Sequence, residues 1–313
     1  MKAFTLDGFD TPPGLREDLP APAPADNEVL VRVLASSVNG VDGATAAGVL
    51  KAMFEHEFPV VLGRDYAGVV ERVGSRVTRY AEGDEVYGAL MHANPTVHDG
   101  SWAELIVVPE DDFVARKPAG LELAAAGAVP LAGITAMLAL DALDLSEGDT
   151  ILVMGASGGV GSFAVQLAAH AGATVIAPGF PEDEDYLRGL GVDEVLERGD
   201  DIVRVVRERH PDGVDALLDL VSYAPEGFDA HATVLKPGGR GASALRAAGD
   251  GPGRTNVMAV PSPENLGRLG RLVDAGTLRV PIQSTYGGLD RAGEALRAFG
   301  TTHTRGKLGI RMT

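Results

Sequence analysis

The sequence predicts an α/β protein with two domains, one a doubly wound parallel sheet and the other rich in β-strands. From about residue 120 onward, helical segments alternate with short apolar strands, the pattern of a parallel sheet covered by helices. The first 118 residues instead show short strands separated by glycines. The chain has 313 residues, which is long enough for two hydrophobic cores.

The β-rich part is expected to be a small, strongly curved sheet or partial barrel. Its predicted strands are bounded by Gly, Asp or Pro and lie at residues 28–35, 69–74, 84–88 and 102–108. After Pro281 the pattern becomes β-like again, with a helix at 289–299 and a strand at 307–312. We expect this tail to return and complete the first domain.

The parallel-sheet part begins with one strand, glycine turn, helix and strand in about thirty residues. The strand at 150–154 is followed by a glycine cluster, a helix that runs to Ala168 and a second strand at 173–177. Further alternation predicts strands at 194–196, 214–220, 240–244 and 257–260, with helices at 202–209, 224–235 and 265–274.

Composition excludes several classes of function. The formal net charge of −17 argues against nucleic acid and anionic membranes as partners, because both require a basic face. The chain has no cysteine, which excludes disulfides, thiolate nucleophiles and cysteine-ligated zinc. The uncharged stretch at 123–140 is interrupted by Gly and Pro, so a buried helix pair is favoured over a membrane span. No secretory signal is visible, and a cytoplasmic protein is expected.

The glycine turn predicts a dinucleotide site. A strand, a Gly-rich turn and a helix N-terminus form a unit in which backbone N–H groups face a pyrophosphate. The G-x-G-x-x-G positions are occupied by Ala156, Gly158 and Gly161, so the fingerprint is imperfect, and a turn that only packs strand on helix is the alternative. The predicted phosphate-binding residues are Gly155, Ala156, Ser157, Gly158, Gly159, Val160 and Gly161.

Six segments, in order along nearly the whole chain, resemble the zinc-independent medium-chain dehydrogenase/reductases, in particular the quinone oxidoreductase (zeta-crystallin-like) and enoyl reductase group. The resemblance implies a GroES-like catalytic domain, residues 1–120 and 281–313, and a Rossmann nucleotide-binding domain, residues 121–280. The six segments are Ser37–Asp42 (SVNGVD), Leu62–Val70 (LGRDYAGVV), Val129–Ala136 (VPLAGITA), Gly155–Gly161 (GASGGVG), Leu235–Arg240 (LKPGGR) and His303–Lys307 (HTRGK).

The resemblance also implies chemistry without a metal. Asn39 and Gly63-Arg64-Asp65 stand where zinc-dependent members carry a ligand Cys and a Gly-His-Glu. The implied reaction is direct hydride transfer from the nicotinamide to a small quinone or α,β-unsaturated carbonyl, here called an enone. An enoyl or enone reductase of a biosynthetic pathway is one alternative, and a nucleotide-binding protein with little catalysis is another.

The predicted catalytic residues are Asn39, Arg64 and Tyr66, and His56 is a further candidate. The resemblance implies that Asn39 lies near the nicotinamide and the substrate oxygen, against the alternative of a turn residue. Arg64 either lines the pocket or pairs with Asp65. Many quinone reductases have tyrosines where this chain has Ala44 and Leu50, so Tyr66 and His56 are substitute proton donors, with a packing tyrosine and a surface histidine as alternatives.

The second strand ends at Ala177-Pro178-Gly179 without the carboxylate typical of NAD sites, which favours NADP(H) without excluding NAD(H). The acidic run 182–185 would repel a 2′-phosphate unless it points to solvent. Arg198 at the end of the third strand would attract the phosphate, with a solvated surface arginine as the alternative. By resemblance, Thr135 lies near the nicotinamide. Val221, Ser243 and Val260 complete the predicted cofactor residues. The apolar strand at 257–260 is a candidate edge for a homodimer, with burial within one chain as the alternative.

Overall fold

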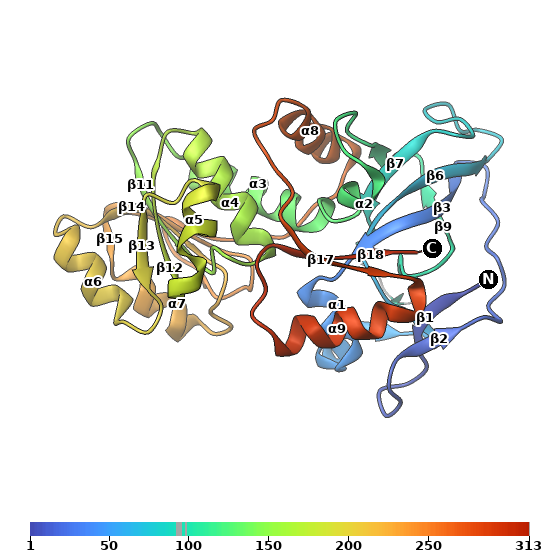
Figure 1. Ribbon diagram of the computed structural model, residues 1–313, viewed down its shortest axis with the longest axis horizontal. Coiled ribbons are helices and arrows are strands. Elements are labelled where there is room, and N and C mark those ends of the chain that lie inside the picture. The colour runs from blue at the N-terminus through green and yellow to red at the C-terminus, as the bar shows by residue number, and fades with distance from the viewer. Residues whose placement is uncertain (92–95, 98, 313) are drawn as a thin grey trace. The chain divides into compact units, whose positions relative to one another are not determined.

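The computed structural model describes residues 1–91, 96–97 and 99–312. Its contacts divide the chain into two compact units (Figure 1). The first unit contains residues 1–134, 260–276 and 280–313, and the second contains 135–259 and 277–279. The mixed α/β fold, with a β-rich part and a parallel-sheet part, is therefore confirmed.

The first unit is built on a curved, mostly antiparallel sheet in the order β10-β7-β6-β3-β18-β17, in which β9 also pairs with β3. The C-terminal tail completes this sheet as predicted, because β18 pairs antiparallel with β3 and parallel with β17. The strands of the unit are β1 (Ala3–Leu6), β2 (Gly14–Arg16), β3 (Glu28–Ser37), β4 (Glu55–His56), β5 (Val60–Val61), β6 (Asp65–Val73), β7 (Glu85–Ala89), β8 (Thr96–Val97), β9 (Leu105–Pro109), β10 (Ala115–Arg116), β17 (Ile282–Gly287) and β18 (Lys307–Arg311).

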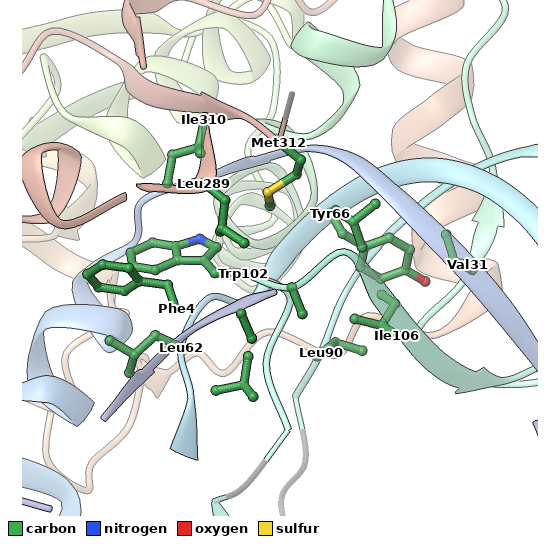
Figure 2. Close-up of a cluster of buried hydrophobic side chains, with 14 of the residues drawn as sticks. Phe4, Val31, Leu62, Tyr66, Leu90, Trp102, Ile106, Leu289, Ile310 and Met312 are labelled. Carbon is green, nitrogen blue, oxygen red and sulfur yellow. The ribbon is translucent and has the colours of Figure 1, made fainter. Parts of the chain in front are cut away.

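The core of the first unit is centred on Trp102, which is fully buried and packs edge-to-face on Phe4 with ring centroids 5.9 Å apart (Figure 2). Gly63 has φ +92°, and a Cβ there would lie 2.2 Å from the Trp102 ring, so only glycine fits. The helices of this unit are α1 (Gly40–Ala46), η1 (Val49–Ala52), α2 (Leu123–Ala126), α8 (Pro263–Asp274), η3 (Leu289–Arg291) and α9 (Ala292–Thr301); α3 (Pro130–Leu143) begins here and continues into the second unit.

The second unit is a parallel sheet in the order β13-β12-β11-β14-β15-β16. This order reverses direction at β11, which is the doubly wound arrangement that the alternating pattern predicts. Its strands are β11 (Thr150–Met154), β12 (Thr174–Gly179), β13 (Glu194–Glu197), β14 (Val214–Asp219), β15 (Leu235–Ser243) and β16 (Arg254–Asn256). Its helices are α4 (Gly159–His170), η2 (Pro181–Asp183), α5 (Glu184–Leu190), α6 (Ile202–Arg209) and α7 (Pro225–Ala232).

The structure differs from the expected elements in two places. The last strand is Arg254–Asn256, and residues 257–260 form no strand. Met258 and Val260 of that segment are exposed, because its apolar residues are not part of the sheet. The strand predicted at 257–260, on which the predicted homodimer edge depended, is therefore wrong, and the homodimer stays a prediction.

The boundaries between the two compact units also differ from the domain boundaries predicted at residues 120 and 281. Helix α2 packs on β3 and β6, and α8 packs on β10, so residues 121–134 and 260–276 belong to the first unit. The Tyr87 hydroxyl donates to the Leu266 carbonyl at 2.6 Å, which ties α8 to β7. The uncharged stretch 123–140 forms the expected pair of helices, and none of the helices in the described residues is long and apolar enough to cross a membrane.

Candidate functional site

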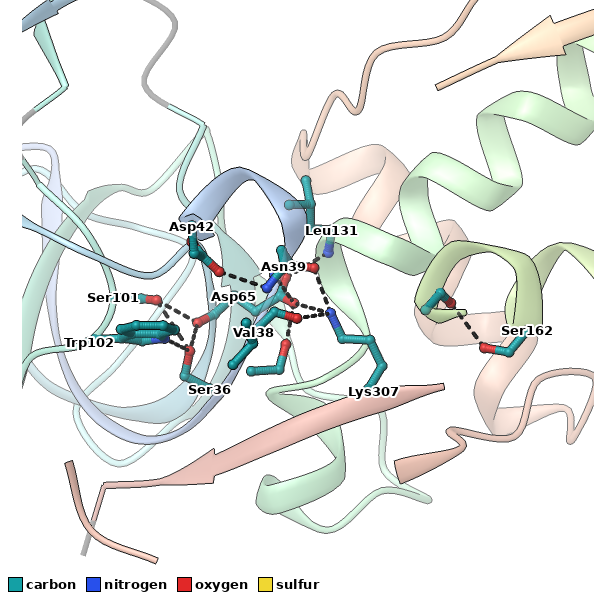
Figure 3. Close-up of polar contacts among 12 residues, drawn as sticks. Ser36, Val38, Asn39, Asp42, Asp65, Ser101, Trp102, Leu131, Ser162 and Lys307 are labelled. Carbon is teal, nitrogen blue, oxygen red and sulfur yellow. Dashed lines mark hydrogen bonds and ion pairs between the residues drawn. The ribbon is translucent and has the colours of Figure 1, made fainter. Parts of the chain in front are cut away.

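A buried polar cluster in the first unit is organised around Asp65, the first residue of β6 (Figure 3). Its Oδ1 accepts from the Leu131 backbone N–H at 2.7 Å, and its Oδ2 accepts from Ser37 Oγ at 2.6 Å. Asn39 Nδ2 and Lys307 Nζ also donate to Oδ2, at 2.9 and 3.3 Å. Both oxygens of this buried carboxylate therefore have hydrogen-bond partners.

Lys307, the first residue of β18, supplies the compensating charge. Its side chain is 2% exposed, and its ammonium donates to the Val38 carbonyl, to Asn39 Oδ1 and to Asp65 Oδ2. An ammonium group has three hydrogens, so all of its donors are satisfied. Lys307 therefore joins the C-terminal tail to the turn after β3 by a buried ion pair.

Asn39 lies between these two groups at the start of α1. Its amide oxygen accepts from Lys307 at 2.6 Å and its amide nitrogen donates to Asp65 at 2.9 Å, while its backbone N–H donates to Asp42 Oδ2. The alternative was a turn residue whose side chain bonds its own backbone, whereas the Asn39 side chain bonds to Asp65 and Lys307. Within the described part of the chain, one amide hydrogen of Asn39 remains for another acceptor.

Arg64 and Asp42 flank the cluster. Arg64 does not pair with Asp65, since Lys307 takes that position; within the described residues its Nη1 donates to the Asp99 carbonyl at 3.3 Å. Burial lowers the pKa of Arg64, against the opposing effect of Asp42. Burial raises the pKa of Asp42 to about 7, although Arg64 and the Asn39 N–H favour its charged form. Asp42 Oδ1 is buried and has no hydrogen-bond partner in the described part of the chain.

The predicted proton donors lie in unsuitable places. Tyr66 is fully buried in β6, its hydroxyl donates to the Phe113 carbonyl at 2.8 Å, and burial raises its pKa well above 10. This is the environment of a packing tyrosine, so the predicted catalytic role of Tyr66 is wrong. His56 Nδ1 contacts the Phe54 carbonyl at 2.9 Å, and its ring packs against Phe9.

In the second unit, the turn between β11 and α4 fits a pyrophosphate. Gly155 has φ +85°, and a Cβ on Gly161 would lie 2.2 Å from the Gly155 carbonyl oxygen, so both glycines are required by the backbone. At Gly158 a Cβ would meet only the Gly155 oxygen, at 3.5 Å, which leaves open space before the helix. The N-terminus of the twelve-residue α4 thus offers its backbone N–H groups to an anion.

A pocket of about 450 Å³ lies at the carboxyl ends of these parallel strands. Arg198, just after β13, lies over the Phe180 ring at 4.7 Å and donates its backbone N–H to the Gly179 carbonyl at 2.9 Å. Asp183 is buried in the same pocket, and its Oδ2 accepts from the Phe180 N–H at 3.3 Å. The lining residues are Met154, Gly155, Ser157, Pro178, Gly179, Asp183, Arg198, Asp200, Asp201, Ile202, Val203, Val221, Ala230 and His231.

The other predicted cofactor residues are dispersed. Val221 lines the pocket, and Thr135 is buried in α3. Ser243 is buried at the end of β15, where its Oγ accepts from the Leu245 and Ala247 backbone N–H groups. Val260 is exposed and belongs to the first unit, so it is not part of the pocket.

Sequence reasoning missed a second buried carboxylate, Asp219 at the end of β14. Its Oδ1 accepts from the Val221 and Ser222 backbone N–H groups, both at 2.9 Å. Its Oδ2 accepts from Ser222 Oγ at 2.7 Å and contacts His231 Nδ1 at 2.8 Å. Burial acts to raise the pKa of Asp219, but His231 and these donors outweigh it and keep that pKa below its usual range. The signal available in the sequence was an acidic residue at the end of an apolar strand.

Comparison with known proteins gives family matches over two parts of the chain. Residues 25–119 match the alcohol dehydrogenase GroES-like domain, and residues 190–308 match the domain described as zinc-binding dehydrogenase. The chain is 32% identical over 302 residues to the chloroplastic NADPH-dependent alkenal/one oxidoreductase of Arabidopsis thaliana, covering 95% of this chain and 75% of the relative. It is 33% identical over 318 residues to the 2-methylene-furan-3-one reductase of Solanum lycopersicum, covering 99% and 79%. The structure of the quinone oxidoreductase from Coxiella burnetii aligns with a TM-score of 0.87 at 29% identity, covering 100% of this chain and 99% of that one.

Proposed function

The chain belongs to the medium-chain dehydrogenase/reductase superfamily, in its group of quinone and alkenal/one oxidoreductases, and we propose that it reduces a small quinone or enone with NADPH and without zinc. It is an NAD(P)H-dependent oxidoreductase. The observation that most supports the proposal is the glycine turn, which leaves open space in front of the α4 N-terminus where a pyrophosphate fits.

The preference for NADPH rests on Arg198. Arg198 lines the pocket, and its backbone N–H bonds to the carbonyl of Gly179, where β12 ends without the carboxylate that would bind a ribose diol. A guanidinium binds phosphate through paired hydrogen bonds, so Arg198 suits a 2′-phosphate. The negative charge of Asp183 in the same pocket opposes phosphate binding. One of its oxygens, Oδ2, accepts a hydrogen bond from the Phe180 N–H and so faces the backbone at Phe180.

The residues of the polar cluster supply the groups that hold the substrate. The nicotinamide, when bound, supplies the hydride. Arg64 carries a positive charge and further N–H donors that suit the oxygen of a quinone or enone, where negative charge develops during reduction. The second amide hydrogen of Asn39 can donate to the same kind of oxygen, while Lys307 and Asp65 hold that amide in place.

Independence from zinc is supported by charge. The positions that resemble a zinc site hold Asn39, Arg64 and Asp65, and the Lys307 ammonium lies 3.3 Å from the Asp65 carboxylate. The Lys307 ammonium beside this carboxylate would repel a divalent cation. Within residues 1–91, 96–97 and 99–312, no three His, Cys, Asp or Glu side chains are grouped to hold a metal.

The proposal is tested by binding and turnover. Nicotinamide fluorescence measures the affinity for NADPH and NADH, and the loss of nicotinamide absorbance measures turnover with a small quinone and a small enone. Arg198→Ala should weaken NADPH binding about 10- to 100-fold, the value of one charged hydrogen bond, and leave NADH binding unchanged. Arg204→Ala is the control, since Arg204 pairs with Glu208 on the exposed face of α6.

Three results would contradict the proposal. A wild-type preference for NADH would overturn the assignment of Arg198. Loss of turnover after dialysis against a chelator, restored by zinc, would overturn the metal-free chemistry. Tight NADPH binding without turnover of either substrate would favour the enoyl reductase of a biosynthetic pathway or the non-catalytic alternative.

A further inference from the structure

The pocket in the second unit also contains an acid–histidine pair, His231 and Asp219, which has no role in the proposed phosphate site. His231, in the last turn of α7, lines the pocket, and its Nδ1 lies 2.8 Å from Oδ2 of the buried Asp219. The histidine side chain is 22% exposed. Its Nε2 has no hydrogen-bond partner within the described residues and is not among their fully buried atoms.

The hydrogen bonds of Asp219 determine which nitrogen of His231 carries the proton. An ionised carboxylate only accepts, so the nitrogen that faces Oδ2 must be protonated. In a neutral imidazole the other nitrogen is then an acceptor. Three other donors, which are the two backbone N–H groups and the Ser222 hydroxyl, also bond to the Asp219 carboxylate and hold it in place. The neutral ring of His231 therefore presents its lone pair at Nε2.

The pocket has two chemically different parts. Met154, Ile202, Val203, Val221 and Ala230 give it apolar walls, which suit the faces of a flat heterocycle. Arg198 follows β13 and His231 contacts the end of β14, and β12 and β11 lie between these strands in the sheet. The phosphate-binding group and the histidine thus come from different sides of the pocket.

We propose that His231, oriented by Asp219, recognises the adenine base of the cofactor by accepting a hydrogen bond from its exocyclic amine at Nε2. A phosphate or a carbonyl oxygen offers only acceptors to such a nitrogen, whereas the adenine amine offers a donor. Asp219 is a positioning residue, because it acts through the ring that it holds. The inference rests on the proposed function, since it assumes that the pocket holds the adenosine half of NADPH.

The test replaces the amine of the base. The reduced nicotinamide hypoxanthine dinucleotide phosphate carries an oxygen acceptor in place of the adenine amine, and its nicotinamide fluorescence is read in the same way. The wild-type protein should bind NADPH at least about 10-fold more tightly than this analogue, because in the analogue the hypoxanthine oxygen and His231 Nε2 are two acceptors that face each other. In His231→Ala the two affinities should become equal within about twofold.

A second variant separates positioning from packing. In Asp219→Asn, the amide oxygen must occupy the Oδ1 position, because two backbone N–H groups donate there, and the amide NH₂ then faces His231 Nδ1. The histidine proton moves to Nε2, which becomes a donor. This variant should prefer the hypoxanthine analogue over NADPH, an inversion that loss of packing would not produce. His210→Ala is the control, since His210 contacts Glu194 outside the pocket, and it should keep the wild-type preference.

Equal affinity of the wild-type protein for the two cofactors would overturn the assignment of His231, whether or not any variant folds. So would a His231→Ala variant that changes the preference for NADPH over NADH and not the preference for adenine, because that result would place the histidine at the phosphate. Failure of the wild-type protein to bind NADPH or NADH would be a failure of the proposed function itself.

Discussion

Replacing Lys307 by methionine should destabilise the first unit strongly. Methionine keeps the length of the side chain but removes the ammonium, so the buried carboxylate of Asp65 loses its counter-charge. Asp65 keeps its hydrogen bonds from Ser37, Asn39 and Leu131, but its charge remains 0% exposed. Breaking one side of a buried ion pair costs about 3–5 kcal/mol.

The expected loss can be read in urea with the single tryptophan of the chain. Trp102 is fully buried in the first unit and donates to Ser36 within the same cluster, so its fluorescence reports the unfolding of this unit. For about 4 kcal/mol and a slope of about 2 kcal/mol per molar urea, the midpoint should fall by about 2 M. The double variant Lys307→Met with Asp65→Asn should recover part of this loss, because the unpaired charge is gone.

Lys2→Met is the control for loss of a lysine, since Lys2 forms an exposed pair with Glu17 and the midpoint should not change. Two results would refute the reasoning. One is a Lys307→Met midpoint equal to that of the wild type. The other is a double variant no more stable than Lys307→Met, because the cost would then not come from the Asp65 charge.

Three other predictions follow from single residues. Asp42 has a pKa of about 7 in the folded protein and 3.8 in the unfolded chain, so the free energy of unfolding should fall by roughly 4 kcal/mol as pH rises from about 4 to 7. Urea titrations measure this change, and Asp42→Asn should lose the pH dependence. Gly161→Ala would place a Cβ 2.2 Å from the Gly155 oxygen, so fluorescence titration should show NADPH affinity falling at least 10-fold; unchanged affinity would contradict the assigned turn. Tyr66→Phe removes only the bond to Phe113, so it should cost about 1 kcal/mol of stability and leave kcat unchanged; a large fall in kcat would restore Tyr66 as a proton donor.

The sequence was sufficient for the parallel sheet and the glycine turn, because both are local. Apolar strands, a glycine cluster and a helix lie within about thirty residues, and the structure places them as β11, α4 and β12. The prediction at 257–260 failed because an apolar run can also lie outside a sheet. The strand that forms is the polar segment Arg254–Asn256, which pairs with β15 through its backbone.

The candidate site was predictable only in part. Asn39 and Arg64 were found through resemblance, and both lie at the buried cluster. The contacts that decide their roles join residues far apart in sequence: Lys307 reaches Asn39 and Asp65 across more than two hundred residues. No local pattern predicts such a contact. Tyr66 was wrong because a tyrosine in a strand faces the core or the solvent depending on register, which a short motif leaves open.

The ion pair between Asp65 and Lys307 sets an order of events during synthesis. Lys307 is made 242 residues after Asp65, a delay of roughly 12 to 50 s at 5–20 residues per second. Until then the edge of β3 at residues 35–37, which pairs with β18, has no partner there. Residues 135–259 complete nearly all of the second unit before β18 emerges. On the ribosome, the unit encoded in the middle of the chain can therefore fold first, while the one that begins at the N-terminus waits with an open sheet edge.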